Sequence, residues 1–277
     1  MGRRRDARLT ELAMNAPAQS ILKDRTALVT GATAGLGLAI AEKLAAAGSN
    51  IVLNGLDDGT KAAADLSARF GVTATFIRAD LSQEAEIDTM MKDILSRVGH
   101  LDIVVNNAVV RSFAPVEDFA SEDWNRALAV NLSAPFHIIK RALPGMKRRG
   151  FGRIINMASI YATRTAENRV DYVTTKTAIL GLTRAVSLET IRTGVTCNAI
   201  SPATLPTPAI QMRIDALAQK EGLSPQQAEG RYLSQRQPSG RFIELGAVGD
   251  LVVFLCGPSG ADISGAALPI DGGWAAS

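Results

Sequence analysis

The sequence predicts an α/β fold in which one domain holds nearly the whole chain. The first observation is an apolar strand at residues 27–29 that leads into a glycine-rich turn and then a helix. The second is that short apolar runs of strand length alternate with segments of helical periodicity along the chain. The third is the length, because 277 residues suffice for one large domain and no internal repeat divides them.

Composition argues against several classes of protein. Hydrophobic residues make up 47% and charged residues 21%, and no apolar run approaches the roughly 20 residues that span a membrane. Six basic and three acidic residues in the first 25 positions account for the whole net charge of +3, so nucleic-acid binding has no support elsewhere. Cys197 and Cys256 lie in apolar segments without metal-ligand spacing, which predicts buried free thiols in a reducing cytoplasm.

Residues 1–24 precede the first strand and show little apolar periodicity. Their arginines and small residues also fit an organelle transit peptide, but we favour a disordered tail or an over-extended start, with Met14 as an alternative start. The folded domain is therefore expected over residues 25–277.

The glycine-rich turn at residues 30–37 is the first candidate binding element. Its glycines allow a tight turn and a close approach to a ligand, and the helix after it offers free N–H groups and a partial positive charge. Strand, turn and helix together form a cradle for phosphate. The glycine spacing of three residues and then one departs from the usual dinucleotide fingerprint, so the turn alone leaves a ligand-free loop as the alternative.

The other elements follow in alternation. Apolar runs predict strands at residues 50–54, 73–78, 101–105, 152–158, 195–200 and 266–270. Helical segments are expected from about residue 61, over 121–144 and over 170–192. Residues 204–240 form a polar, partly helical insertion whose position suits a lid over a substrate, with an ordinary helical excursion as the alternative.

Motifs along the chain carry a resemblance to a known family. Asn106-Asn107-Ala108 ends a buried strand, Asn131 lies in the long helix, and Ser159 ends the next strand. Tyr172 and Lys176 follow in a helix, four residues apart. With the glycine-rich turn, these motifs resemble the short-chain dehydrogenase/reductase family from about residue 25 onward. The resemblance implies a single-domain Rossmann fold, a doubly wound parallel sheet with helices on both faces, and hydride transfer between a nicotinamide cofactor and an alcohol or carbonyl.

The same resemblance implies a cofactor site. Its expected residues are Gly31, Thr33, Gly35, Leu36, Gly37, Gly55, Leu56, Asp80, Leu81, Asn107, Ala108, Tyr172, Lys176, Pro202 and Thr207. The second strand end, Asn54-Gly55-Leu56, offers no cation for the extra phosphate of NADP, and Ala34 stands where many NADP-using relatives carry Arg or Lys. NAD is therefore favoured. Capping a helix is the alternative role of Asp80 and Thr207, and Val109 stands where the family usually has glycine.

Tyr172 and Lys176 share one face of their helix because of their spacing. The Lys176 ammonium favours the Tyr172 phenolate, which can take a proton from a substrate hydroxyl as hydride leaves its carbon. By resemblance, Ser159 holds the substrate oxygen and Asn131 anchors a water that relays the proton through Lys176. The spacing alone is common on exposed helices, but Ser159 thirteen residues upstream and the glycine-rich turn favour catalysis.

Several stretches look closest to the 3-hydroxybutyrate dehydrogenase branch of this family, among them residues 113–117 and 271–274. The positions where that branch grips a small carboxylate correspond here to Arg111, Tyr161, Arg169 and Arg213. All four differ in residue type from the branch. Up to three arginines in place of one cation favour a hydroxy acid more strongly anionic than 3-hydroxybutyrate, unless some of them face solvent.

Two classes of function stay open from the sequence. The first is an active NAD-dependent dehydrogenase of a hydroxy acid, with a polyol or sugar as the alternative substrate. The second is a cofactor-binding protein that serves as a regulatory module without catalysis. The resemblance also implies a homotetramer, and we expect a small-molecule substrate with no metal, nucleic-acid or membrane partner.

Overall fold

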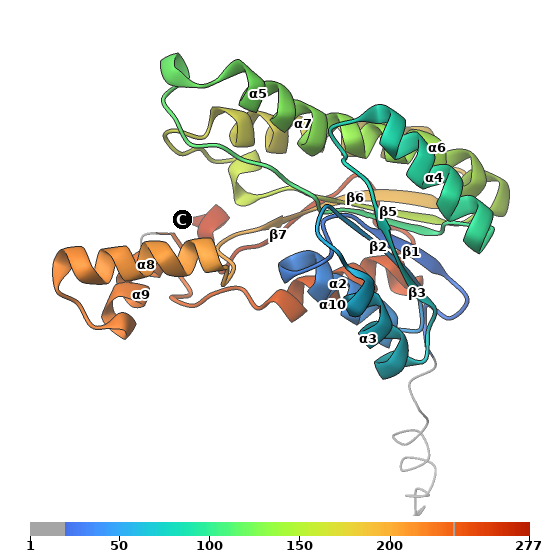
Figure 1. The fold of residues 1–277 in the computed structure, drawn as a ribbon, viewed down its shortest axis with the longest axis horizontal. Coiled ribbons are helices and arrows are strands. Elements are labelled where there is room, and N and C mark those ends of the chain that lie inside the picture. The colour runs from blue at the N-terminus through green and yellow to red at the C-terminus, as the bar shows by residue number, and fades with distance from the viewer. Residues whose placement is uncertain (1–19, 235) are drawn as a thin grey trace, which may run out of the picture.

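The computed structural model describes residues 20–234 and 236–277. A sheet of seven strands lies between two layers of helices (Figure 1). The strands are β1 (Thr26–Val29), β2 (Asn50–Gly55), β3 (Ala74–Arg78), β4 (Ile103–Asn106), β5 (Gly152–Met157), β6 (Val195–Pro202) and β7 (Ala267–Ile270). Their spatial order is β3-β2-β1-β4-β5-β6-β7, and all neighbours are parallel. The predicted doubly wound sheet is confirmed.

Helices cover both faces of the sheet (Figure 1). One layer contains α4 (Glu84–Val98), α5 (Ser121–Leu128), α6 (Ala134–Arg149) and α7 (Val170–Thr190). The other contains α2 (Gly35–Ala46), α3 (Thr60–Phe70) and α10 (Leu245–Cys256). Of these, α4 and α10 add to the helices expected from the sequence. Within the described residues, no helix is long and apolar enough to cross a membrane.

Both faces of the sheet are buried, which explains why the strands read as nearly continuous apolar runs. Leu53 of β2 packs with Leu44 of α2 and Val252 of α10 on one side. On the other side, Val104 of β4 packs with Ile138 of α6. Cys197 and Cys256 are free and buried, and burial raises the pKa of each thiol to about 12.

The helix expected over residues 121–144 is longer and is interrupted. A π-helical turn, Ala129–Ser133, separates α5 from α6, and α6 continues through Pro144 to Arg149. Proline removes one backbone donor, but Pro144 is exposed, whereas Ala142 and Met146 on the same helix are buried against the sheet. Packing therefore carries the helix past the residue at which the sequence pattern ends it.

Most of the predicted tail, residues 1–19, lies outside the described residues. From Ser20 onward the chain belongs to the fold, because Ile21–Asp24 form a turn and Leu22 is 1% exposed within the cluster around α2 and α10. The folded part therefore starts at least as early as Ser20 rather than at residue 25.

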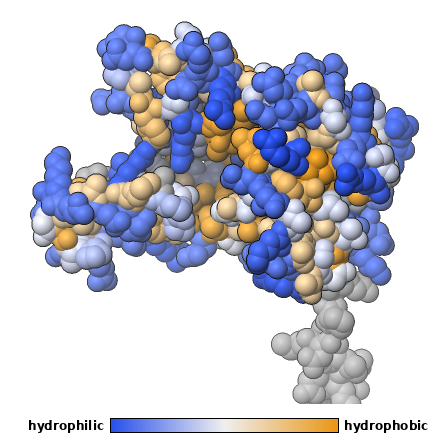
Figure 2. All heavy atoms as spheres, in the orientation of Figure 1, coloured by the Kyte–Doolittle hydropathy of each residue, from blue (hydrophilic) through white to orange (hydrophobic). Residues whose placement is uncertain are grey.

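The insertion after β6 folds as two helices, α8 (Pro208–Glu221) and α9 (Pro225–Ser234), which pack together around Ile214. The pair extends beyond one end of the sheet (Figure 1). Figure 2 shows a hollow between this pair and the layer that contains α5 and α7. The helical character predicted for residues 204–240 is confirmed, and closure of the insertion as a lid stays a prediction.

Gln237 ties the two ends of this insertion together. It is fully buried, and its Oε1 accepts a hydrogen bond from the Thr204 amide at 2.7 Å. Its Nε2 donates to the Arg241 carbonyl at 2.7 Å. The base of the α8–α9 pair is therefore anchored to the end of β6.

Candidate active site

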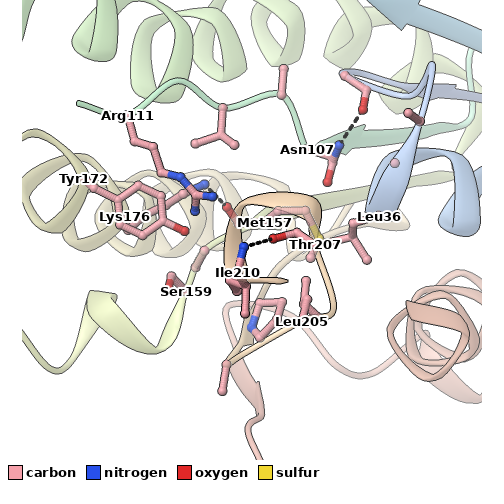
Figure 3. A pocket seen from close by; sticks show the side chains of 18 residues that line it. Leu36, Asn107, Arg111, Met157, Ser159, Tyr172, Lys176, Leu205, Thr207 and Ile210 are labelled. Carbon is pink, nitrogen blue, oxygen red and sulfur yellow. Dashed lines mark hydrogen bonds between the residues drawn. The ribbon is translucent and has the colours of Figure 1, made fainter. Parts of the chain in front are cut away.

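The candidate site lies at the carboxyl ends of the parallel strands, where the strand order reverses between β1 and β4. Crevices at such a reversal are the usual ligand sites of open α/β sheets. The loops after β1, β4, β5 and β6 surround a cavity of about 380 Å³ here, shown in Figure 3. We call it the central cavity.

The turn after β1 has the backbone geometry of a phosphate cradle. Gly31 and Gly35 each have φ of 58°, in the left-handed region that favours glycine. A Cβ atom on Gly37 would lie 2.3 Å from the Gly31 carbonyl oxygen and 2.6 Å from Asn107 Nδ2, so only glycine fits. No described side chain caps α2, whose N-cap is Ala34, so its first N–H groups are free for an anion.

Asn107 holds this turn against the end of β4. Its Nδ2 donates to the carbonyl oxygens of Thr30 at 2.9 Å and Gly31 at 3.0 Å. In return, Thr30 Oγ1 accepts hydrogen bonds from the amides of Asn107 at 2.9 Å and Ala108 at 3.0 Å. The family's asparagine is therefore a structural clamp on the glycine-rich turn as well as part of the cavity wall.

A second cavity of about 320 Å³ continues from the central cavity, because Gly31, Ala34, Ala108 and Val109 line both. We call it the outer cavity. Asp57, which follows β2 and is not among the cofactor residues expected from the resemblance, lines it. Arg126 of α5 is a second residue that the sequence did not reveal, since its helix lies far along the chain.

Asp80 lines the outer cavity and also shapes its own loop. Its Oδ1 accepts a hydrogen bond from the Ser82 amide at 2.9 Å, and this bond is the main cause of the lowered pKa of Asp80. The N-cap of α4 is Gln83, so Asp80 forms a turn before the helix rather than capping it.

The two cavities form one groove whose residues fit a nicotinamide dinucleotide. The glycine cradle and the uncapped start of α2 suit the pyrophosphate in the middle of the groove. The outer cavity at one end suits the adenosine half, and the central cavity leads to Tyr172 and Lys176 at the other.

Most cofactor residues expected from the resemblance line this groove. The central cavity is lined by Leu36, Gly37, Asn107, Ala108, Tyr172, Lys176, Pro202 and Thr207. The outer cavity is lined by Thr33, Gly55, Leu56, Asp80 and Leu81, and Gly31 lines both. Gly35 lines neither cavity and serves the turn through its backbone. Besides lining the central cavity, Thr207 accepts a hydrogen bond at Oγ1 from the Ile210 amide at 3.4 Å and caps α8, the alternative role named for it, while its contact with a cofactor stays a prediction.

Tyr172 and Lys176 lie on α7 and reach the central cavity together. Lys176 Nζ lies 5.7 Å from the centre of the Tyr172 ring and donates a hydrogen bond to the Met157 carbonyl. The Lys176 side chain is buried, and this burial, with a smaller contribution from the charge of Arg111, lowers its pKa to about 8. Ser159 lines the same cavity, and Figure 3 shows Tyr172, Lys176 and Ser159 on one side of the pocket.

Asn131 is not brought to the reacting groups by its side chain. It lies in the π-helical turn, and its Oδ1 accepts from the Val110 amide at 2.9 Å while its Nδ2 donates to the Val110 carbonyl at 2.8 Å. Nδ2 also lies 3.2 Å from Thr175 Oγ1. Among the described residues it lines neither cavity of the groove, so the structure shows it fixing the loop after β4.

Asp171 completes this clamp, although no motif singles it out beyond its place before Tyr172. It is 1% exposed, and its Oδ2 accepts from the Ser112 amide at 3.0 Å. Its Oδ1 accepts from the Tyr172 amide at 2.6 Å. Asn131 and Asp171 therefore fix the backbone on both sides of Arg111, whose side chain extends into the pocket beside Tyr172 (Figure 3).

A third, smaller cavity of about 70 Å³ adjoins the central one, because Arg111, Ser159 and Tyr172 line both. We call it the arginine cavity. The three other predicted substrate residues, Tyr161, Arg169 and Arg213, all line it. The structure adds Tyr232, Arg236 and Trp274. The sequence also contained an indication for Arg236, because this residue directly precedes Gln237-Pro238-Ser239, a stretch that resembles the 3-hydroxybutyrate dehydrogenase branch.

Comparisons with known proteins agree with this geometry. A protein-family model described as "Enoyl-(Acyl carrier protein) reductase" matches residues 31–275. D-beta-hydroxybutyrate dehydrogenase of Cupriavidus necator is 43% identical over 257 residues, which cover 92% of this chain and 100% of that protein. The protein of the same name from Rhizobium meliloti is 40% identical over 255 residues, covering 91% and 99%.

Solved structures show the same likeness. L-sorbose reductase from Gluconobacter frateurii, complexed with NADPH and L-sorbose, has a TM-score of 0.87 and 29% sequence identity to this chain. The match covers 92% of this chain and 98% of that one.

Proposed function

The chain belongs to the short-chain dehydrogenase/reductase family of oxidoreductases that act on CH–OH groups, and we propose that it oxidises a small hydroxy acid with NAD. The observation that carries this proposal is one cavity lined by Ser159, Tyr172 and Lys176 together with Arg111. The first three residues handle the hydroxyl, and the arginine supplies a charge for an acid.

Tyr172, Lys176 and Ser159 have separate roles in the proposed proton transfer. A nicotinamide held in the groove would supply the acceptor for the hydride that leaves the carbinol carbon. Tyr172 takes the hydroxyl proton, and the Lys176 ammonium beside its ring favours the phenolate that does so. Ser159 Oγ accepts from the Tyr161 amide at 3.2 Å, which leaves its hydroxyl hydrogen to donate to the substrate oxygen. In reduction, Tyr172 returns the proton.

The hydrogen bond from Lys176 to the Met157 carbonyl holds the ammonium near the Tyr172 ring. The Arg111 guanidinium lies 5.9 Å from the centre of the Tyr172 ring and adds a second positive charge near the phenol. Because Asn131 and Asp171 clamp the loop on both sides of Arg111, we give both the role of positioning residues. The water-anchoring role that the resemblance implies for Asn131 stays a prediction beside this positioning role.

The preference for NAD rests on the end of β2. Asp57 lines the outer cavity there, and a carboxylate repels the additional phosphate of NADP while it can accept hydrogen bonds from a ribose. Arg126 is the cation in the same wall, and its charge also acts on Asp80, whose pKa it helps to lower. We therefore propose that the charge of Arg126 stabilises the Asp80 carboxylate and does not bind the additional phosphate of NADP.

The choice of a hydroxy acid rests on charge. The relatives from Cupriavidus necator and Rhizobium meliloti are named for a hydroxy acid, and arginines line the cavity next to Ser159 and Tyr172. The likeness to L-sorbose reductase favours a sugar or polyol as the second candidate. A neutral substrate, however, leaves the arginines without an anion to pair with.

Replacement of Tyr172 tests the proposal. The variant Tyr172→Phe should lose turnover about 10²- to 10⁴-fold while it keeps NAD binding, because it lacks only the proton carrier. Tyr161→Phe removes the hydroxyl of a second tyrosine at the site, which is proposed to contact substrate but not to carry the proton, so it should lose less turnover than Tyr172→Phe. Retention of more than a tenth of the turnover by Tyr172→Phe would refute the assignment. A wild-type protein that binds NAD but turns over no hydroxy acid, sugar or polyol would support the regulatory alternative.

We further propose a homotetramer that works in the cytoplasm. Leu188 and Ile191 at the end of α7 are 78% and 59% exposed, and Phe136 on α6 is 47% exposed, so apolar surface on the long helices is available for contact between copies. β7 is an edge strand of the sheet, which supports its use as a second contact.

A further inference from the structure

The arginine cavity carries more positive charge than one carboxylate needs. Arg111, Arg169, Arg213 and Arg236 line it, from the loop after β4, the loop before α7, helix α8 and the segment after α9. Its described lining residues include no Asp or Glu. Within the described part of the chain, none of the four arginines forms an ion pair with a carboxylate.

Two of these arginines are held on one aromatic ring. The Cζ atom of Arg169 lies 4.1 Å from the centre of the Phe113 ring, and that of Arg213 lies 4.7 Å from the same point. The two guanidinium groups are therefore no farther apart than the sum of these distances. Guanidinium groups stacked on an aromatic face keep their N–H edges free, and those edges match the geometry of a carboxylate. Phe113 therefore contacts both guanidinium groups and keeps Arg169 and Arg213 near each other, and we call this ring the Phe113 platform.

The remaining arginines stand apart from this pair. The Cζ atom of Arg111 lies 5.9 Å from the centre of the Tyr172 ring, and the backbone on both sides of Arg111 is clamped. Arg236 lies 4.1 Å from the centre of the Tyr232 ring and donates a hydrogen bond to the Tyr232 carbonyl at 3.0 Å, so its position is also fixed.

This arrangement is electrostatically unfavourable without a ligand. Burial lowers the pKa of Arg169 below its ordinary value, and the charges of Arg213 and Arg111 lower it further, against the opposing effect of Tyr161. Arg169 and Arg236 are half-buried, whereas Arg111 and Arg213 are exposed, so solvent screens the charge of Arg169 only in part and an anion bound to it is stabilising. A single carboxylate can pair with one guanidinium or bridge two, so a monocarboxylate leaves at least two of the four arginines unmatched.

Resting on the proposed dehydrogenase function, we propose that the substrate is a small hydroxy acid with two carboxylates, one bound by Arg169 and Arg213 on the Phe113 platform and the other by Arg111. The hydroxyl then lies between them, at Ser159 and Tyr172. The volume of about 70 Å³ keeps the substrate short, since a water-sized group occupies on the order of 10–15 Å³ by this measure.

Matched substrates test the proposal directly. Malate is 3-hydroxybutyrate with its methyl group replaced by a carboxylate. In 3-hydroxyglutarate that methyl carbon is kept and carries a carboxylate. We expect kcat/KM with NAD to be at least tenfold higher for one of these dicarboxylates than for 3-hydroxybutyrate. Malate and 3-hydroxybutyrate are assayed as both enantiomers, whereas 3-hydroxyglutarate is achiral. Turnover of 3-hydroxybutyrate with equal or higher kcat/KM would overturn the proposal and leave the proposed function standing, as would a preference for a phosphorylated hydroxy acid.

Arginine variants test the mechanism of that preference. Arg169→Met and Arg213→Met should each lower kcat/KM for the preferred dicarboxylate ten- to a hundredfold, the range expected for a lost charge-assisted hydrogen bond. The loss for 3-hydroxybutyrate should be much smaller, so the ratio of the two values falls. Phe113→Leu should lower the same ratio without removing a charge. Arg97→Met, at an exposed arginine of α4 that lines none of the three cavities described above, is the control and should change neither value. Equal losses for both substrates would show that these arginines support the fold, which would overturn the proposal.

Binding separates this proposal from the proposed function. Calorimetry of the NAD complex should show succinate binding at least tenfold tighter than butyrate, with the difference lost in Arg169→Met and Arg213→Met. If no hydroxy acid is turned over but this arginine-dependent binding is found, the dehydrogenase function fails and the dicarboxylate site stands. Equal binding of succinate and butyrate would overturn the dicarboxylate site.

Discussion

Lys176→Met should make the protein more stable and nearly inactive. Lys176 is buried, and burial lowers its pKa from 10.5 to about 8, so its charged form is less favourable in the folded protein than in the unfolded chain. Methionine has a similar shape and no charge, which removes this penalty. The variant also lacks the cation next to Tyr172, so turnover should fall at least about 10²-fold.

The magnitude follows from the pKa. The drop from 10.5 to about 8, at about 1.4 kcal/mol per pH unit, corresponds to a cost of about 3 kcal/mol while the lysine is charged in both states. Loss of the hydrogen bond to the Met157 carbonyl offsets about 1 kcal/mol of the gain. A net gain of about 2 kcal/mol raises the Tm by roughly 4–8 °C for a domain of this size.

The pH dependence gives the sign of the effect. Because the folded pKa is the lower one, the cost is fully present below pH about 8 and disappears as the pH rises toward 10.5, where the unfolded chain also loses its proton. The Tm advantage of Lys176→Met should therefore be present at pH 7 and vanish or reverse at pH 10.

Thermal unfolding of the cofactor-free protein at one protein concentration is the assay. Lys140→Met, an exposed lysine on α6, is the control and should show no such pH-dependent difference. A variant Lys176→Met that is less stable than wild type at pH 7, or that differs from wild type by the same amount at both pH values, would refute this account of the buried charge.

Three further outcomes are expected. Gly37→Ala should abolish NAD binding in a calorimetric titration, because its Cβ would lie 2.3 Å from the Gly31 carbonyl; binding within tenfold of wild type would contradict the cradle. The ratio of kcat/KM values should favour NAD over NADP at least tenfold and should fall in Asp57→Ala; a wild-type preference for NADP would reverse the cofactor proposal. Light scattering should show a tetramer at micromolar concentration, and a monomer throughout that range would count against the proposed assembly.

Short-range patterns in the sequence were enough for the sheet and the centre of the site. The strand, turn and helix over residues 26–46 follow from local apolar spacing and glycines, and all are found in the structure. Tyr172 and Lys176 share a helix face because the helix repeat alone brings residues four apart together. Family motifs supplied the remaining placements around the groove, including Ser159 at the end of β5.

Tertiary packing decided what local patterns do not encode. Asn131 reaches Val110 instead of the cavity because a π-helical turn and the loop after β4 happen to meet there. Helix α6 runs past Pro144 because its buried side is held against the sheet while the proline faces solvent. In both cases a contact between distant segments outweighs the local preference.

The arginine cavity shows the same division most clearly. Each arginine is an ordinary surface residue in its own stretch of sequence, and nothing within that stretch says where its side chain ends. Only the order of the strands and the position of the α8–α9 pair bring Arg111, Arg169, Arg213 and Arg236 to one small cavity. Local sequence thus determined the hydride-transfer machinery, whose parts lie on neighbouring strand ends and one helix. The family resemblance predicts Arg111, Arg169 and Arg213 at the substrate site. Their meeting with Arg236 in one cavity depends on long-range packing of four separate elements, and for that reason only the tertiary structure revealed it.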